Sequence, residues 1–152
     1  MAKNIYDAMN NKIVDMTWNM DYGKLYEFLC GGDAVARLWG SPPPGDSFWK
    51  MVDRKGFKST VYDKNVANKE KKVDVAIGAA MTKDAYKTLD KQKDELLLVA
   101  GDSDFEPVVT DLKNEGFKVE VAFWDHASAE IRRVVGDKGF ISLNPHHGHF
   151  MR

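Results

Sequence analysis

Short runs rich in apolar residues alternate along the chain with longer segments in which apolar positions recur every third or fourth residue. The short runs are typical of strands, and the longer spacing is typical of amphipathic helices. The runs predict strands over 34–39, 95–100, 118–123 and 140–143, and the spaced segments predict helices over 21–29, 46–54, 73–89, 105–114 and 128–135. This alternation predicts an α/β fold, Rossmann-like and doubly wound, with a mostly parallel sheet and helices on both faces.

Two predicted connections from helix to strand have similar sequences. Gly56 is followed by Phe57 and Lys58, and Gly116 is followed by Phe117 and Lys118. Glycine adopts the left-handed backbone that ends many helices, so each of these glycines is expected to end a helix just before a strand begins. Two successive crossovers built alike favour the doubly wound sheet.

The composition indicates one small domain without a bulk charge. The 152 residues include 22 Lys and Arg against 23 Asp and Glu, a net charge of -1. This balance excludes a polybasic binder, so an anionic partner must be held by a local patch. No apolar stretch is long enough for a membrane span or a signal peptide, and we expect a cytoplasmic protein. The single Cys30 excludes an internal disulfide and a thiolate zinc site.

Two acids directly follow the apolar run 95–100. Asp102 and Asp104 come at the predicted carboxyl end of this strand, where open α/β sheets form their ligand crevice. Carboxylates there are suited to a hard divalent cation such as Mg²⁺ or Mn²⁺. The alternative is that Asp104 is only the N-cap of the next helix, which explains Asp104 well and Asp102 poorly.

A lysine-rich segment precedes the helix predicted from residue 73. Lys69, Lys71 and Lys72, together with Lys64, are candidates to contact phosphates, and Asp74 lies in the first turn of the helix. The alternative is a solvated loop followed by an acid that only complements the helix dipole.

The chain resembles the NYN domain of the LabA-like group over residues 21–145. The resemblance is carried by three runs, Lys-Lys-Val-Asp-Val-Ala-Ile from residue 71, Val-Ala-Gly-Asp-Ser-Asp-Phe-Glu-Pro-Val from residue 99 and Val-Glu-Val-Ala-Phe-Trp-Asp-His-Ala-Ser from residue 119. That group is similar to PIN-domain ribonucleases, whose clustered acids bind Mg²⁺ or Mn²⁺ for RNA hydrolysis. The resemblance implies catalytic and metal-ligand roles for Asp74, Asp102 and Asp104.

The resemblance also implies a partner. Single-stranded RNA would cross the site. Ser103 is a candidate to offer a hydroxyl to a phosphate, and a turn role is its alternative. Trp39 and Trp124 are candidates to stack on bases, and a core position is the alternative for both. A homo-oligomer or a protein partner is left open. A weaker candidate is the histidine-containing tail 146–152, for which we expect a frayed end.

Two departures from the family pattern bear on activity. Relatives begin with a central strand ending in an Asp, and here the only early candidate is the short run 12–16; we expect residues 1–20 to be poorly defined and the first strand with its acid to be absent. Ala80 stands where many relatives carry another acid. The alternative function is therefore a catalytically silent module that binds RNA or protein. A phosphatase of the haloacid-dehalogenase type ranks lower, because it needs an early Asp-x-Asp that is missing.

Overall fold

The computed structural model describes residues 3–6, 12–15, 20–30, 34–40, 45–62 and 69–151, with only the backbone for 3–6, 12–15 and 69–71. The chain divides into two compact units. The first comprises Met1–Lys3, Val14–Val73 and His146–Arg152, and the second comprises Asn4–Ile13 and Asp74–Pro145. Among the described residues, no helix is long and apolar enough to cross a membrane.

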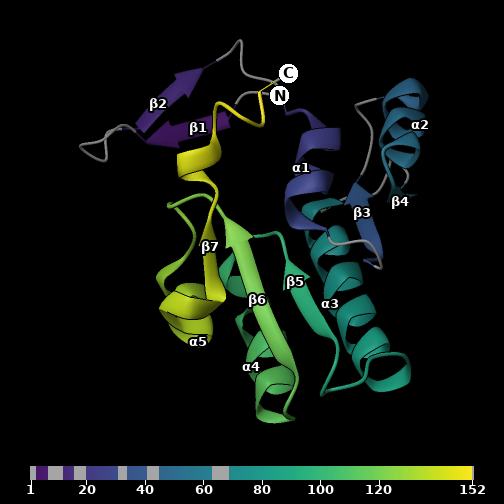
Figure 1. The fold of residues 1–152 in the computed structure, drawn as a ribbon, viewed down its shortest axis with the longest axis vertical. Helices are drawn as coiled ribbons and strands as arrows, with labels where there is room; N and C mark the ends of the chain where they lie inside the picture. The colour runs from purple at the N-terminus through teal and green to yellow at the C-terminus, as the bar shows by residue number, and fades with distance from the viewer. Residues whose placement is uncertain are drawn as a thin grey trace. The chain divides into compact units, whose positions relative to one another are not determined.

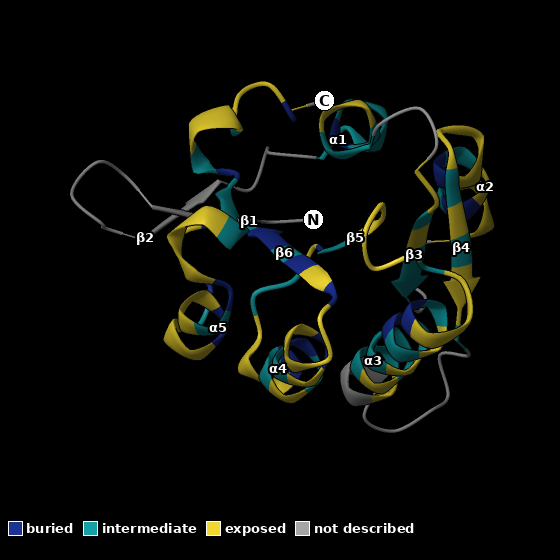
Figure 2. Cartoon of the chain, turned by 60° about the horizontal axis from the view of Figure 1, so that its bottom comes forward, coloured by how far each residue is buried: buried dark blue, intermediate teal, exposed yellow. Residues whose placement is uncertain are grey.

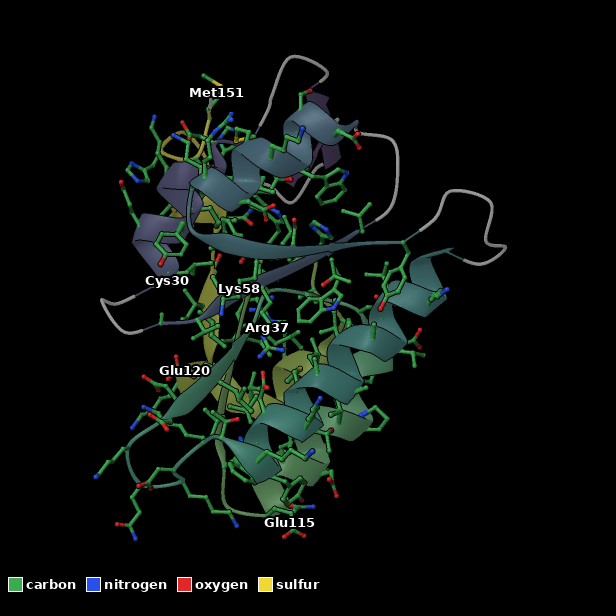
Figure 3. All side chains as sticks on the ribbon, turned by 90° about the vertical axis from the view of Figure 1, so that its right-hand side faces the viewer. Cys30, Arg37, Lys58, Glu115, Glu120 and Met151 are labelled. Atoms are coloured by element: carbon green, nitrogen blue, oxygen red, sulfur yellow. The ribbon has the colours of Figure 1, made fainter. Side chains whose placement is uncertain are left out.

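The first unit contains a two-stranded parallel sheet with helices, and its elements are α1 (Tyr22–Leu29), β3 (Ala36–Gly40), α2 (Asp46–Arg54) and β4 (Phe57–Val61) (Figure 1). Arg37 of β3 stands opposite Lys58 of β4 in the register, and both are exposed (Figure 3). The turn before β4 depends on Gly56, whose φ is 113°. A Cβ at Gly56 would lie 2.8 Å from the Tyr26 ring, so both the backbone and the packing require glycine there.

The C-terminal segment packs on α1, which contradicts the expected frayed end. Phe150 is fully buried, and its ring centre lies 5.1 Å from that of Phe28. The backbone N–H of Asp21 donates to the Phe150 carbonyl at 2.7 Å, and Met20 bridges Met151. A buried aromatic ring supplies the apolar contact that holds the segment in place.

The second unit is built on a parallel sheet in the order β5-β6-β7, and its elements are β5 (Glu95–Leu98), α4 (Glu106–Asn114), β6 (Lys118–Phe123), α5 (Ala129–Gly139) and β7 (Phe140–Ser142). Leu98 lies opposite Val121, and Phe123 lies opposite Ser142. The middle strand β6 is the most buried of the three (Figure 2). Because α4 and α5 contact each other as well as β6, they cover one face of the sheet together.

The core of the second unit lies between this sheet and its helices. It includes Leu98, Val119 and Val121 from the strands, Val109 and Leu112 from α4, Ile131 and Val135 from α5, and Met81 and Ala85 from α3 (Lys69–Lys87). The parallel strands joined by helices confirm the α/β fold class expected from the sequence.

Three local expectations differ from the structure. Helix α3 begins at Lys69 rather than residue 73, because lysine and glutamate are strong helix formers, so Lys69, Lys71 and Lys72 lie on a helix and not in a loop. The sequence predicts Asp46 or Ser47 as the cap of the second helix, whereas α2 has Gly45 as its N-cap and no side-chain cap bond. The early run 12–16 forms β2 (Lys12–Asp15), which pairs with β1 (Lys3–Tyr6), so within the described residues it is no partner of β3 or β5.

Candidate metal centre

Three carboxylates of the second unit converge on one place. One carboxylate oxygen from each of Asp74, Asp102 and Asp104 lies within 4.8 Å of the other two. Asp74 is half-buried on α3, and the other two are exposed in the segment that follows β5. Residues from a helix and from a strand exit, distant in the sequence, therefore form a single acidic cluster.

The turn that carries two of these acids is closed by one of them. Asp102 Oδ1 accepts a hydrogen bond of 2.9 Å from the backbone N–H of Asp104, and the carbonyl of Asp102 accepts one of 3.2 Å from Phe105. Asp102 is thus the N-cap of a short 3₁₀ turn, η1 (Ser103–Phe105). The alternative interpretation of the sequence gave Asp104 the capping role, and the structure gives it to Asp102. No hydrogen bond to the Asp104 carboxylate occurs among the described residues.

Packing fixes this turn. Phe105 is 3% exposed and belongs to the core. A Cβ at Gly101 would overlap the Phe123 ring, so only glycine lets the backbone pass there. The Gly101 carbonyl also accepts a 2.8 Å hydrogen bond from Ser128, the N-cap of α5. Asp102 and Asp104 are therefore presented by a backbone held on both sides.

The cluster has the donors and the size of a divalent-cation site. Three carboxylate oxygens are the hard ligands that Mg²⁺ and Mn²⁺ prefer. Two oxygens on opposite sides of one Mg²⁺ lie about 4.2 Å apart, twice the bond length of about 2.1 Å. The observed spread, within 4.8 Å, is close to that value. The residues present fit one such cation, and water or a phosphate would have to complete its coordination.

The structure describes the side chains of two of the residues predicted to contact nucleic acid, Ser103 and Lys72. Ser103 is exposed between the two acids of the turn. Lys64 and the side chains of Lys69 and Lys71 lie outside the described residues. Lys72 is exposed in the first unit, with its Nζ 4.9 Å from the centre of the Tyr62 ring.

The tryptophans differ from each other. Trp124 is 4% exposed and belongs to the buried core, so of the two roles that the sequence left open for it the core position is confirmed and stacking on a base is excluded. Burying the large apolar surface of the indole ring favours an interior position for a tryptophan that directly follows a buried strand. Trp39 is half-buried, and its stacking role stays a prediction.

A second group of polar residues lies at the same edge of the sheet; sequence reasoning places Asp125 after a strand, at the border of the expected crevice, and misses its partners Ser142 and Asn144. Asp125, the second residue after β6, accepts from Ser142 Oγ at 2.5 Å, and its N–H donates to Asn144 Oδ1 at 2.8 Å. Its carbonyl accepts from Arg132 Nη1 at 3.0 Å. The available signal was the placement of Asp125 and Ser142 at the carboxyl ends of two strands, which parallel pairing brings side by side.

Comparison with known proteins agrees with this architecture. The family model described as NYN domain matches residues 3–144. Neither the curated proteins nor the solved structures gave a match. The family match spans most of the chain and contains the whole acidic cluster. The chain belongs to the NYN domain family.

Proposed function

We propose that this NYN domain is a metal-dependent endoribonuclease, in which Asp74, Asp102 and Asp104 hold Mg²⁺ or Mn²⁺ against an RNA phosphodiester. The observation that carries the proposal is the convergence of these three carboxylates within 4.8 Å at the exit of a parallel strand. The similarity of the NYN family to PIN-like nucleases supports the same chemistry.

The residues of the carboxylate turn have different roles at such a site. Asp102 uses one oxygen to close the turn, which orients the carboxylate for coordination through its other oxygen. Asp104 keeps its carboxylate out of hydrogen bonds with the described residues, so both of its oxygens are available to a cation or to a bound water. Ser103, exposed between them, offers a hydroxyl to a phosphate oxygen. A bound cation would supply a more acidic water and would offset charge on the phosphoryl oxygens.

The substrate we propose is single-stranded RNA. Two of the three acids, Asp102 and Asp104, lie in an exposed turn at a strand exit, which single-stranded RNA can reach because its bases are unpaired. The lysines of the segment 64–72 are proposed as phosphate contacts for this strand.

Cleavage of a fluorescent single-stranded RNA tests the proposal. Wild type is compared in Mn²⁺ and in EDTA with the double variant Asp102→Asn/Asp104→Asn and with Asp111→Asn, which removes an exposed carboxylate from α4 outside the cluster. We expect metal-dependent products from wild type and Asp111→Asn and none from the double variant. Equal cleavage by wild type and the double variant would reject the assignment.

The second candidate is a binding module without catalysis. This alternative is favoured by Ala80, which stands on α3 where many relatives carry a further acid, so that Ala80 adds no carboxylate to that of Asp74. Fewer acidic ligands mean weaker coordination and less charge to hold a metal. Under this alternative the wild type binds RNA in the same assay and leaves it intact in Mn²⁺.

A further inference from the structure

We propose that Arg132 is a phosphate-binding residue for the RNA strand on which the carboxylate cluster acts, contacting a phosphate next to the metal-bound one. This inference rests on the proposed function and adds a named contact to it. The chain's net charge of -1 means that RNA must be held by local cations. Arg132 is such a cation, and it lies at the carboxyl edge of the sheet, the edge that also carries the carboxylates.

The Arg132 side chain is held by contacts to two other segments. Its Nη1 donates a 3.0 Å hydrogen bond to the carbonyl of Asp125, and its Cζ lies 4.5 Å from the centre of the Phe140 ring. The first contact follows β6 and the second begins β7. An arginine fixed between a carbonyl and an aromatic ring has already lost much of its rotamer freedom, so binding a ligand costs it less entropy.

The guanidinium keeps donors for a ligand. It carries five N–H groups, and one of them donates to Asp125 within the described structure. The residue is exposed, so a phosphate can reach the others. The planar fork of N–H groups matches two phosphate oxygens, which is the geometry that makes arginine a strong phosphate ligand.

Arg132 lies on the same side of the unit as the carboxylates. Helix α5 contacts η1, and Ser128 at its start donates to Gly101, the residue before Asp102. Arg132 donates to Asp125 after β6, and the exits of the neighbouring strands β5 and β6 are one strand spacing apart, about 5 Å. A strand that follows the carboxyl edge from the carboxylate turn therefore passes Arg132.

Acidic neighbours make the positive charge of Arg132 matter for RNA binding. Asp125 and Glu130 are exposed near Arg132, and their carboxylates repel RNA. Arg133 is the matched comparison, because it is also exposed on α5 and shows neither the hydrogen bond to Asp125 nor the contact with Phe140.

The test measures binding of a fluorescein-labelled oligouridylate in EDTA, where cleavage is suppressed. For Arg132→Gln we expect about ten-fold weaker binding at moderate salt. The slope of log affinity against log salt should become shallower by about 0.7, the value of one phosphate contact on a single strand. Arg133→Gln should stay within about two-fold of wild type with an unchanged slope. Arg132→Lys should restore the slope, because it keeps the charge, and should restore only part of the affinity, because it lacks the fork.

Mn²⁺ binding, followed by water-proton relaxation without RNA, separates the two proposals. Arg132→Gln should bind Mn²⁺ as wild type does. Loss of Mn²⁺ affinity in this variant would overturn the inference, because Arg132 would then only support the metal-binding turn. Equal effects of Arg132→Gln and Arg133→Gln on RNA affinity, or no effect of either, would also overturn it. Failure of wild type to bind Mn²⁺ and to cleave RNA would reject the proposed nuclease function. The phosphate contact of Arg132 would still stand if Arg132→Gln lost RNA affinity and Arg133→Gln did not.

Discussion

Removing the charge of Asp104 should stabilise the metal-free protein and abolish its response to Mn²⁺. Asp104 lies within 4.8 Å of both Asp74 and Asp102, and its carboxylate receives no hydrogen bond from the described residues. Folding without a cation therefore brings three negative charges together. Asp104→Asn keeps the size of the side chain and removes that charge, which isolates the electrostatic contribution.

The size of this effect follows from the spacing. Two unit charges 4.8 Å apart repel by about 0.9 kcal/mol in a water-like dielectric, and more where the protein lowers the dielectric. Asp104 takes part in two such pairs, a repulsion of about 1.7 kcal/mol at low salt. Loss of its favourable interaction with the start of α4 opposes this gain by about 0.3–1 kcal/mol. The net stabilisation is about 1 kcal/mol, or a rise in Tm of about 2–4 °C for a chain of this length.

Thermal unfolding at low ionic strength, in EDTA and in Mn²⁺, measures both effects. Mn²⁺ at ten times its Kd should stabilise wild type by about 1.4 kcal/mol and leave Asp104→Asn close to its metal-free Tm. Asp111→Asn, outside the cluster, should respond to Mn²⁺ as wild type does. A variant that melts below wild type in EDTA, or that keeps the full Mn²⁺ response, would refute the electrostatic argument.

Three further predictions concern the fold around the site. Gly101→Ala forces a Cβ into the Phe123 ring, so we expect a loss of about 1–3 kcal/mol by denaturant unfolding together with weaker Mn²⁺ binding; a neutral variant would show that the turn is not held there. Phe150→Ala empties a fully buried site and should cost about 3–5 kcal/mol, whereas a freely frayed segment would tolerate it. Asp21→Ala removes the N-cap of α1 and should cost about 1 kcal/mol near neutral pH. Because the hydrogen bond from the backbone N–H of Lys24 lowers the pKa of Asp21 below its ordinary 3.8, this contribution is present above that pH and is lost as the pH falls through the lowered pKa; a wild-type and variant difference that persists in strong acid would contradict it.

The elements that the sequence predicted best are those encoded by neighbouring residues. Strand β6 has the predicted bounds, Lys118–Phe123, because Gly116 ends the preceding helix and Asp125 and His126 begin a turn just beyond the strand. Gly56 and Gly116 take positive φ values of 113° and 94°, as expected for glycines that end helices. The proximity of Asp74 to Asp102 and Asp104 came from the family resemblance, since spacing alone links only the last two.

Features that depend on distant contacts were not predictable in this way. Which acid closes the turn depends on backbone angles that Phe105 and Gly101 fix through the core. The placement of Phe150 on α1 joins two segments of the first unit that are distant in the sequence, and no local pattern encodes it. For Arg132 the sequence leaves RNA contact and an ordinary solubilising role open, because its contacts come from the turn after β6 and from the start of β7, which no local pattern joins. The absence of a first central strand stays a prediction.

The most direct test of the central claim is a Mn²⁺ titration of the whole chain, read by water-proton relaxation enhancement. The account predicts saturable binding of one ion by wild type. Binding should be strongly weakened in Asp102→Asn and in Asp104→Asn, and unchanged in Asp111→Asn. Equal enhancement in all four proteins would mean that the three converging carboxylates do not hold the cation, and the proposed metal centre would be wrong.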